Sequence, residues 1–584
     1  MPTFAIGERD FLLDGEPLQI ISGTLHYFRV HPDQWADRLR KARLMGLNTI
    51  ETYVAWNAHA PRRGEFHTDG QLDLPRFLRL AAEEGLHAIV RPGPYICAEW
   101  SNGGLPAWLT GDPDVRPRSS EPNYLAAVGD YFGHLLPLLA PLQVTRGGPV
   151  LAVQVENEYG AYGDDTGYLR TLADALRQGG IEVPLFTSDQ ADDTMLARGG
   201  VPGLLRTANF GSRAAERLAV LRRHQPTGPL MCMEFWDGWF DRWGGPHHTT
   251  PVEEAARALD ELLAAGASVN LYMFHGGTNA GFTNGANDKG VYEPTVTSYD
   301  YDAPLSEWGE PTAKYAAFRD VIARYAKVPA ETPEPAPPAP RLHVPVSGSA
   351  PLLAALGRLG AAERHQDAPT MDDLGHYQGF LLYRTRLAAE GEAVLSVGEV
   401  RDRAQVFVDG AAAGVLNRDF HDTTLAVAAP RPGAVLEILV EDQGRVNYGA
   451  RIGEPKGLIG PVLLDGAPLR GWEVVRLPLD DLSGVEFGPA RAPLPRAGFH
   501  EGTFDLEEAA DLHLDTSGWG KGQVWVNGVN LGRYWRRGPQ RTLYVPAPVV
   551  RAGSNRLVVL ELESSARSGW DFVPAADLGP VPVD

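Results

Sequence analysis

Acidic and amide side chains follow apolar runs at two distant points of the chain. Glu156, Asn157 and Glu158 come directly after the largely apolar run 150–155, and Glu234 comes directly after the run 230–233. The strands of a parallel barrel deliver side chains to its C-terminal rim, where polar residues are more often chemical than structural. We therefore expect these side chains to share one rim. Surface acids after an edge strand are the alternative interpretation of the first stretch.

Two carboxyl groups on one rim suit glycoside hydrolysis. Acids at the ends of a fourth and a seventh strand would lie close enough to flank one bond. One acid would protonate the leaving oxygen while the other attacks or stabilises the oxocarbenium-like centre, and a separation of roughly 5 to 5.5 Å corresponds to retention of configuration. Nearby Trp and Tyr rings would pack against the apolar face of a sugar, while Asn and Glu take its hydroxyl groups.

Residue type alone leaves other candidates for both acids. Glu156 could serve in place of Glu158, and Asp237 or Asp241 in place of Glu234, although Glu234 directly follows an apolar run and so sits where a strand ends. The histidines lack tight metal-ligand spacing, and we expect no metal site and no cofactor. We interpret three of them as hydrogen-bonding supports rather than proton shuttles: His26, His59 and His275.

Eight short apolar runs alternate with helical patterns over the first 327 residues, and this alternation predicts a (β/α)8 barrel. Because no phosphate-cradling Gly-rich turn follows the first strand, an open doubly wound sheet is the less favoured alternative. The predicted strands are 20–25, 49–54, 88–91, 150–155, 185–187, 206–209, 230–233 and 269–273. The predicted helices are 34–45, with Asp33 as N-cap and Gly46 as its stop, then 74–85, 166–179, 251–265 and 311–327.

The chain changes character after the barrel. A Pro-rich stretch at 328–340 excludes helix and central strand, and short alternating strands separated by Gly, Pro and Asp then predict antiparallel β-sandwiches. The segment 406–410 (Val-Phe-Val-Asp-Gly) recurs at 524–528 (Val-Trp-Val-Asn-Gly), and each copy carries a hairpin-turn dipeptide. We therefore predict a catalytic TIM barrel at 1–327, a linker and connecting segment at 328–370, and two jelly-roll-like β-sandwich domains at 371–485 and 486–584. Packing against the barrel is favoured over independent carbohydrate binding for the two β-domains.

Composition narrows the classes of function. The 584 residues carry a net charge of −21, which argues against nucleic-acid and anionic-membrane partners because both need basic surface. The two cysteines, Cys97 and Cys232, are read as free thiols. With no basic N-terminal region followed by an apolar stretch, and no apolar run of 18 residues, a cytoplasmic protein is expected. The sequence leaves a homo-oligomer open.

Four long motifs, in order along the barrel, resemble the β-galactosidases of glycoside hydrolase family 35. No single tetrapeptide would be specific, but the four occur with compatible spacing. They are Pro92-Gly-Pro-Tyr-Ile-Cys-Ala-Glu-Trp100 with Gly103-Gly-Leu-Pro-Ala-Trp108, Gln154-Val-Glu-Asn-Glu-Tyr-Gly160, Glu234-Phe-Trp-Asp-Gly-Trp239, and Ser298-Tyr-Asp-Tyr-Asp-Ala-Pro-Leu305.

The resemblance implies a role for individual residues. Glu158 matches the family's acid/base, Glu234 its nucleophile, and Asn157 the asparagine that holds the sugar 2-hydroxyl. The remaining matches line the galactose subsite: Tyr53, Cys97, Ala98, Glu99, Trp239, Tyr299 and Tyr301. The expected function is a retaining exo-β-galactosidase that takes a small-molecule galactoside or oligosaccharide. A related exo-glycosidase on the same frame and a catalytically dead glycan-binding barrel are the alternatives, and the preferred linkage stays open.

Overall fold

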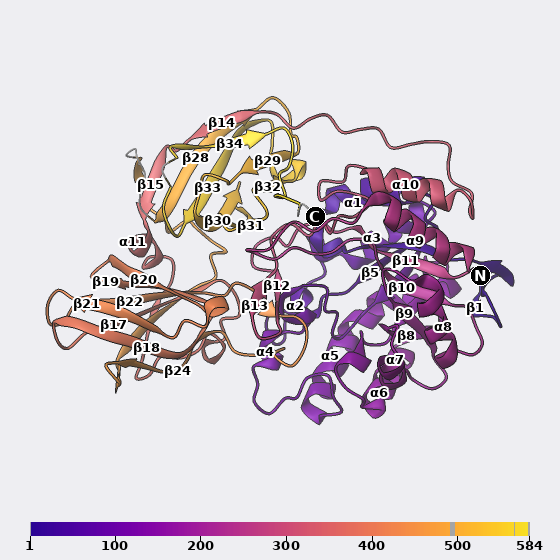
Figure 1. The fold of residues 1–584 in the computed structure, drawn as a ribbon, viewed down its shortest axis with the longest axis horizontal. Coiled ribbons are helices and arrows are strands. Elements are labelled where there is room, and N and C mark those ends of the chain that lie inside the picture. Colours follow the sequence, from indigo (N-terminus) through magenta and orange to yellow (C-terminus); the bar gives the residue numbers. More distant parts are fainter. Residues whose placement is uncertain (1, 491–496, 566, 582–584) are drawn as a thin grey trace.

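A closed barrel of eight parallel strands forms the N-terminal half of the computed structural model, which describes residues 2–490, 497–565 and 567–581 (Figure 1). Hydrogen bonding connects the strands in the order β10-β11-β4-β5-β6-β7-β8-β9. Each predicted strand overlaps one of them, so the predicted barrel is confirmed. The strands are β4 (Ile21–Leu25), β5 (Thr49–Tyr53), β6 (His87–Arg91), β7 (Val150–Gln154), β8 (Leu185–Gln190), β9 (Leu205–Asn209), β10 (Met231–Trp236) and β11 (Ser268–His275).

Helices cover the outside of the barrel. The predicted ones correspond to α1 (Trp35–Met45), α3 (Leu74–Glu83), α6 (Thr166–Gln178), α9 (Val252–Ala264) and α10 (Ala313–Ile322), whereas α5 (Pro122–Leu139), α7 (Asp193–Gly199) and α8 (Ala214–His224) were not predicted. Gly46 ends α1 with φ of 103°, as expected of a left-handed C-cap. Asp33 is not its N-cap, because a 3₁₀ turn over Pro32–Gln34 moves the start of α1 to Trp35 and puts Gln34 at the cap position.

Helix α5 is long and apolar enough, by length and composition, to cross a membrane. Its apolar side chains instead pack into the core that surrounds the barrel strands, with Tyr124, Tyr131 and Leu135 each nearly fully buried. The core helix of a soluble protein passes the same test of composition. A single helix of this kind is weak evidence for a membrane span.

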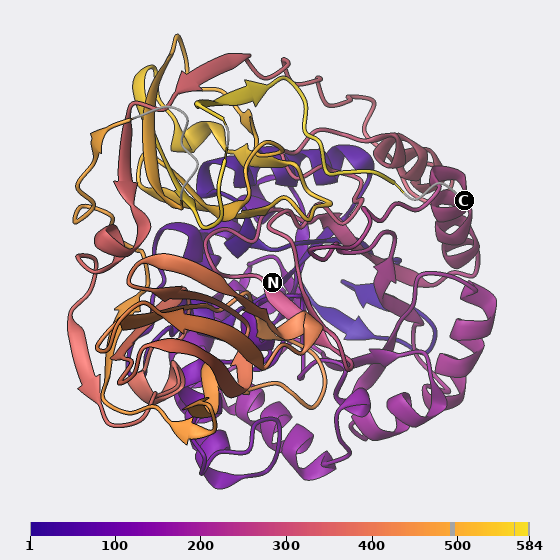
Figure 2. The same cartoon turned by 60° about the vertical axis from the view of Figure 1, so that its left-hand side comes forward.

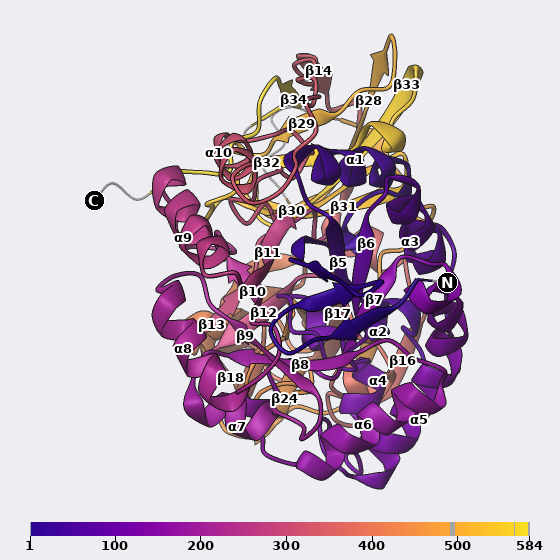
Figure 3. The ribbon, with the colours of Figure 1, turned by 90° about the vertical axis from the view of Figure 1, so that its right-hand side faces the viewer.

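A small antiparallel sheet precedes the barrel and was not predicted. Its strands are β1 (Phe4–Ile6), β2 (Phe11–Leu13) and β3 (Glu16–Leu18). Phe11 is buried and lines a small cavity with Ile20, Leu205 and Met231, which stand at or beside the N-terminal ends of barrel strands. In Figure 3 this sheet lies across the barrel strands. The opposite, C-terminal rim is thereby left for the site.

Two β-sandwiches follow the barrel and lie side by side against it (Figures 1 and 2). The first pairs a six-stranded sheet, β16-β26-β17-β22-β19-β20, with a four-stranded sheet, β21-β18-β24-β25; the last pairs β27-β15-β28-β33-β30-β31 with β14-β34-β29-β32. The strands of the first are β16 (Ala362–His365), β17 (Phe380–Arg386), β18 (Gly391–Arg401), β19 (Arg403–Val408), β20 (Ala411–Asn417), β21 (Thr424–Ala429), β22 (Val435–Glu441), β24 (Gly457–Leu464), β25 (Ala467–Pro468) and β26 (Trp472–Leu477). Those of the last are β14 (Leu342–Pro345), β15 (Gly348–Pro351), β27 (Gly488–Pro489), β28 (Gly498–Leu506), β29 (Leu512–Asp515), β30 (Lys521–Val526), β31 (Val529–Trp535), β32 (Thr542–Val545), β33 (Gly553–Glu561) and β34 (Gly569–Val573).

The internal repeat marks the same hairpin in both sandwiches. β19 and β20 pair around Asp409 and Gly410, and β30 and β31 pair around Asn527 and Gly528. All four turn residues have positive φ, between 45° and 86°. Because a two-residue turn of this type matches the twist of its strands, Asp-Gly and Asn-Gly fit both positions. The prediction of two related modules is confirmed by this topology.

The segment predicted as a linker and connector, 328–370, contributes strands to both sandwiches. β14 pairs with β34 and β15 pairs with β28, both in the last module, whereas β16 pairs with β26 of the first. The last module therefore needs two strands that precede the first module in the sequence. The exact domain boundaries stay a prediction.

A further small sheet joins the barrel to the first sandwich. After β11 the chain forms the hairpin β12 (Gly285–Asp288) and β13 (Tyr292–Pro294), and β12 pairs in parallel with β23 (Arg445–Val446) of the first sandwich. This joint stands beside the C-terminal rim of the barrel, because Trp100, in the loop after β6, bridges to Asn284 just before β12. The β-domains thus reach the rim.

Candidate active site

Glu158 lies just past β7 with its carboxyl group between two amides. Asn209, the last residue of β9, donates from Nδ2 to Oε1 at 2.9 Å, and Gln190, the last residue of β8, donates to Oε2 at 3.4 Å. Glu158 is only 7% exposed. Burial, and after it the charge of Glu234, raise the pKa of Glu158 to about 8, so this carboxyl group is protonated near neutral pH.

Glu234 lies within β10 rather than after it, because the strand runs on to Trp236; the predicted strand end at 233 is wrong by three residues. Three donors surround its carboxylate. Tyr53 Oη donates to Oε1 at 2.9 Å and Arg91 Nη2 donates to the same oxygen at 2.6 Å, while Trp236 Nε1 donates to Oε2 at 3.1 Å. Donors of this kind, one of them cationic, stabilise a negative charge on Glu234.

Arg91 connects the surroundings of the two acids. Its Nη2 donates to Asn157 Oδ1 at 2.7 Å as well as to Glu234, and its Nε donates to Gln154 Oε1 at 2.7 Å. The guanidinium also lies 4.0 Å from the centre of the Tyr53 ring. Arg91 is fully buried and fixes Asn157, the neighbour of Glu158, relative to Glu234.

Glu156 lies in a different environment from Glu158. Arg118 grips its carboxylate with both arms of the guanidinium, at 2.9 and 2.8 Å, and Tyr168 Oη donates to it at 3.0 Å. Glu156 and Glu158 have φ of 58° and 44°, so the backbone here is not extended. The two turns direct the side chains to separate partners, and Glu156 holds the loop through Arg118.

Three consecutive residues after β6 adopt left-handed backbone conformations. Cys97, Ala98 and Glu99 have φ of 59°, 54° and 47°. Such non-glycine residues cost of order 1–3 kcal/mol each and persist where surrounding contacts hold them. Arg29 Nη2 donates to the Ala98 carbonyl at 2.5 Å and Gly285 N–H donates to the Glu99 carbonyl at 2.7 Å. The turn is built to present Glu99.

Glu99 joins the aromatic residues after β13. Tyr299 Oη donates to Glu99 Oε2 at 2.5 Å, and burial raises the pKa of Glu99 to about 7. The rings of Tyr299 and Tyr301 lie 5.5 Å apart, and Trp239 lies 6.4 Å from Tyr301 with 42% of its surface exposed. Gly238 permits this arrangement, because a Cβ there would lie 1.7 Å from the Tyr301 carbonyl oxygen.

Asp241 and Asp237, the alternatives to Glu234 in the sequence, lie in different environments from Glu234. Asp241 pairs with His247 at 2.7 Å and with His248 at 2.9 Å. Asp237 is buried, and burial raises its pKa well above the ordinary range. Among the histidines, burial lowers the pKa of His26 and His275, and that of His59 to about 4, which leaves neutral rings. Within the described ranges, no three His, Cys, Asp or Glu side chains gather to hold a metal ion.

Several site residues were missed by the sequence interpretation. Arg91, Gln190 and Asn209 are each the last residue of a barrel strand, so the rule that singled out Glu158 could have found them. Asn447, from the first sandwich, donates from Nδ2 to Cys97 Sγ at 3.4 Å, and its carbonyl accepts from Tyr95 Oη at 2.6 Å. No local signal points to Asn447, since it lies 350 residues further along the chain.

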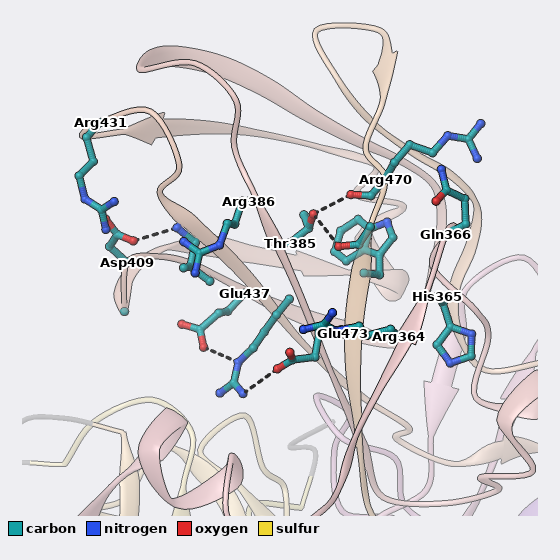
Figure 4. Close-up of a pocket in the computed structure, with 15 residues that line it drawn as sticks. Arg364, His365, Gln366, Thr385, Arg386, Asp409, Arg431, Glu437, Arg470 and Glu473 are labelled. Carbon is teal, nitrogen blue, oxygen red and sulfur yellow. Dashed lines mark hydrogen bonds and ion pairs between the residues drawn. The ribbon is translucent and has the colours of Figure 1, made fainter.

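A hollow of about 1100 Å³ on the first sandwich is a second place where a ligand could be sought (Figure 4). Its floor carries Arg364, Glu473, Arg384 and Glu437, which stand opposite one another across β16, β26, β17 and β22. Arg384 Nε donates to Glu437 Oε1 at 2.9 Å and Arg384 Nη1 lies 3.8 Å from Glu473. Alternating charges of this kind neutralise one another on a solvated sheet face. The hollow therefore provides no substitute for the site at the barrel rim.

Comparison with known families covers most of the chain. Residues 10–325 match the model described as glycosyl hydrolases family 35. Residues 369–479 match the first all-beta domain of beta-galactosidase, and residues 497–555 match the galactose-binding domain of beta-galactosidase. The three matches follow the barrel, the first sandwich and the last sandwich in order.

Individual relatives match over nearly their full length. A beta-galactosidase of Xanthomonas manihotis is 42% identical over 93% of this chain and 91% of the relative. Human beta-galactosidase is 44% identical over 96% of this chain and 87% of the relative, and human beta-galactosidase-1-like protein 2 is 42% identical over 98% and 91%.

Proposed function

Because the chain belongs to glycosyl hydrolase family 35 and is a β-galactosidase, we propose that it removes terminal β-linked galactose by double displacement, with Glu234 as nucleophile and Glu158 as acid/base. The observation that carries the proposal is that the two carboxyl groups have opposite surroundings: those of Glu158 favour the protonated form, and those of Glu234 favour a negative charge. Burial and the Glu234 charge keep Glu158 protonated, while Tyr53 and Arg91 stabilise a charge on Glu234.

In the first step, a Glu234 oxygen attacks the anomeric carbon as the glycosidic bond breaks. Glu158 gives its proton to the departing oxygen, so that the leaving alcohol is neutral and the enzyme carries a galactosyl ester on Glu234. Glu158 is then a carboxylate and takes a proton from water, whose oxygen attacks the same carbon and releases galactose. The two inversions together retain the configuration. The proton is restored to Glu158 and the charge to Glu234.

Recognition of galactose is assigned to the rest of the rim. Asn157, held by Arg91, would meet the 2-hydroxyl group, and Glu99 with Tyr299 would bind further ring hydroxyls. The Cys97 and Ala98 turn would supply backbone groups, Tyr53 and Tyr301 would contact the sugar, and the exposed Trp239 would provide an aromatic wall for the sugar face. Both acids are only 7% exposed, which supports an exo-acting enzyme that takes the end of a glycan chain.

The proposal is tested by dependence on the leaving group. In Glu158→Gln, the rate with a galactoside that has a poor leaving group should fall by about 10² to 10⁴, since that departure needs a proton. An aryl galactoside with a strongly acidic phenol needs no proton and should keep most of its bond-cleavage rate, measured as a pre-steady-state burst. Full activity of Glu158→Gln on the poor leaving group would contradict the assignment.

A panel of chromogenic β-glycosides tests the sugar itself. Turnover should be confined to the galactoside, because Glu99 and Tyr299 define the subsite. Preferential turnover of another sugar would favour the related exo-glycosidase. Three further predictions belong to the same proposal: a small-molecule or oligosaccharide galactoside as substrate, a cytoplasmic location, and the lack of nucleic-acid and membrane partners. The oligomeric state stays open.

A further inference from the structure

We propose that the last sandwich is a working part of the galactose subsite, and that Arg533 and Gln540 are positioning residues for the two loops that carry Glu99, Tyr299 and Tyr301. The inference rests on the proposed function of that subsite. Neither residue is placed next to the sugar. Each acts through a barrel segment that it holds, as the hydrogen bonds around them show.

Arg533, in β31, stands where all three domains meet. It is 1% exposed. Its Nε donates to the carboxylate of Glu441 at 2.7 Å and its Nη2 to the Asp442 carbonyl at 2.9 Å, both in the first sandwich. Its Nη1 donates to Asn284 Oδ1, in the barrel, at 2.8 Å. One guanidinium therefore ties the two sandwiches to the barrel.

Asn284 links Arg533 to the left-handed turn formed by Cys97, Ala98 and Glu99. It is 2% exposed, bridges to Trp100, and precedes Gly285, whose N–H donates to the Glu99 carbonyl at 2.7 Å. The Asn284 Nδ2 donates to the Gln443 carbonyl at 2.8 Å, so its amide is fixed at both ends. Because the left-handed turn that ends at Glu99 persists only under outside contacts, the position of Asn284 sets that of Glu99.

The same module holds the second loop. Thr297 Oγ1 donates to the Arg533 carbonyl at 2.6 Å and accepts from the Arg533 N–H at 3.0 Å. Gln540, 3% exposed, accepts from the backbone N–H of Ser298 at 2.9 Å through Oε1. Tyr299 follows directly. A Cβ on Gly532 would lie 2.4 Å from Thr297, so β31 approaches this loop as closely as a backbone can.

The acids themselves do not depend on these contacts. Glu234 is held by Tyr53, Arg91 and Trp236, and Glu158 by Asn209 and Gln190, all within the barrel. Loosening the last sandwich should therefore weaken binding of the sugar while leaving the chemical step intact. A purely structural role would instead lower the amount of folded enzyme and leave each active site normal.

Arg533→Lys separates charge pairing from positioning, because lysine keeps a cation for Glu441 and loses the reach to Asn284. In the full-length enzyme, normalised to active sites by the burst, we expect KM for an aryl galactoside and the inhibition constant of free galactose to rise together, roughly three- to tenfold. The kcat should stay within about twofold. The fall of kcat/KM at alkaline pH should occur at the same pH as in the unmodified enzyme. Arg536→Lys is the matched control. Arg536 directly follows β31, is exposed and pairs with Glu563.

A double-mutant cycle tests the route. Asn284→Ala should raise the same two constants, and adding Arg533→Lys should raise them no further, since Arg533 acts through Asn284. Gln540→Ala, which does not disturb Glu441, should raise them independently. Unchanged KM and galactose inhibition in both Arg533→Lys and Gln540→Ala, with only a lower Tm, would overturn the inference. Glu99→Gln separates this failure from that of the subsite: if Glu99→Gln also leaves both constants unchanged, the proposed galactose subsite itself is wrong.

Discussion

The Glu156 site and the Glu158 site differ in everything except their place in the chain. Both carboxyl groups are buried just after β7, two residues apart. Glu156 faces a guanidinium that satisfies both its oxygens, whereas Glu158 faces two neutral amides and the charge of Glu234. A like charge beside a buried carboxyl group disfavours its ionised form, and this applies to Glu158. At similar burial, the two carboxyl groups thus differ in their partners, and this difference supports the proposed role of Glu158 as acid/base.

Removing the like charge should have the largest effect. In Glu234→Gln, kcat/KM on galactosides should fall by roughly 10⁴ or more, since the proposed nucleophile is lost. The pKa of Glu158 should also move down from about 8, because the neighbouring charge that raises it is gone. A ¹³C-carboxyl NMR titration of Glu158 measures this shift. A Glu158 pKa that does not move would mean that burial alone sets it.

Breaking the Arg118 pair should cost stability instead of chemistry. Glu156→Gln leaves the buried Arg118 without its countercharge, and the free energy of unfolding should fall by about 3–5 kcal/mol. Each folded enzyme should retain its kcat and its alkaline limb. Glu182→Gln, which removes an exposed partner of Arg146, is the control and should leave Tm unchanged. Loss of the alkaline limb in Glu156→Gln would make Glu156, not Glu158, the proton donor.

Much of the fold and of the candidate site could be predicted from the sequence, because the C-terminal ends of all strands in a parallel barrel lie on one rim. The apolar runs predict all eight strands, and the strand-end rule singles out Glu158 and Glu234, although β10 continues past Glu234 to Trp236. The choice between Glu156 and Glu158 rested on family resemblance. Reasoning from an extended chain, in which side chains alternate between two faces, fails here because both residues have positive φ. Those turns depend on Arg118 and Ser188, which lie far away in the sequence.

The contributions of the β-domains to the site could not be predicted. Asn447, Arg533 and Gln540 reach the rim only because β12 pairs with β23 and β31 packs against Thr297. Such contacts join residues about 160 to 350 positions apart, and no periodicity or motif in a single sequence encodes them. Packing was predicted for these domains, but the residues that do it were not.

The smallest expected effect concerns the amides that distinguish the Glu158 site. Asn209 donates to the Glu158 carboxylate, and this hydrogen bond lowers a pKa that burial and Glu234 raise. Asn209→Ala should therefore raise the Glu158 pKa. Glu158 must be protonated to act as an acid, so kcat/KM should fall as pH rises through its pKa, near 8 in the unmodified enzyme. In the variant this fall should occur at higher pH.

Profiles of kcat/KM against pH measure the shift. Activity near pH 7 should be reduced by less than about tenfold, because one neutral hydrogen bond is lost. A limb that moves to lower pH would mean that Asn209 stabilises the protonated acid, and the contrast between an amide-bound Glu158 and a guanidinium-bound Glu156 would not explain their different roles.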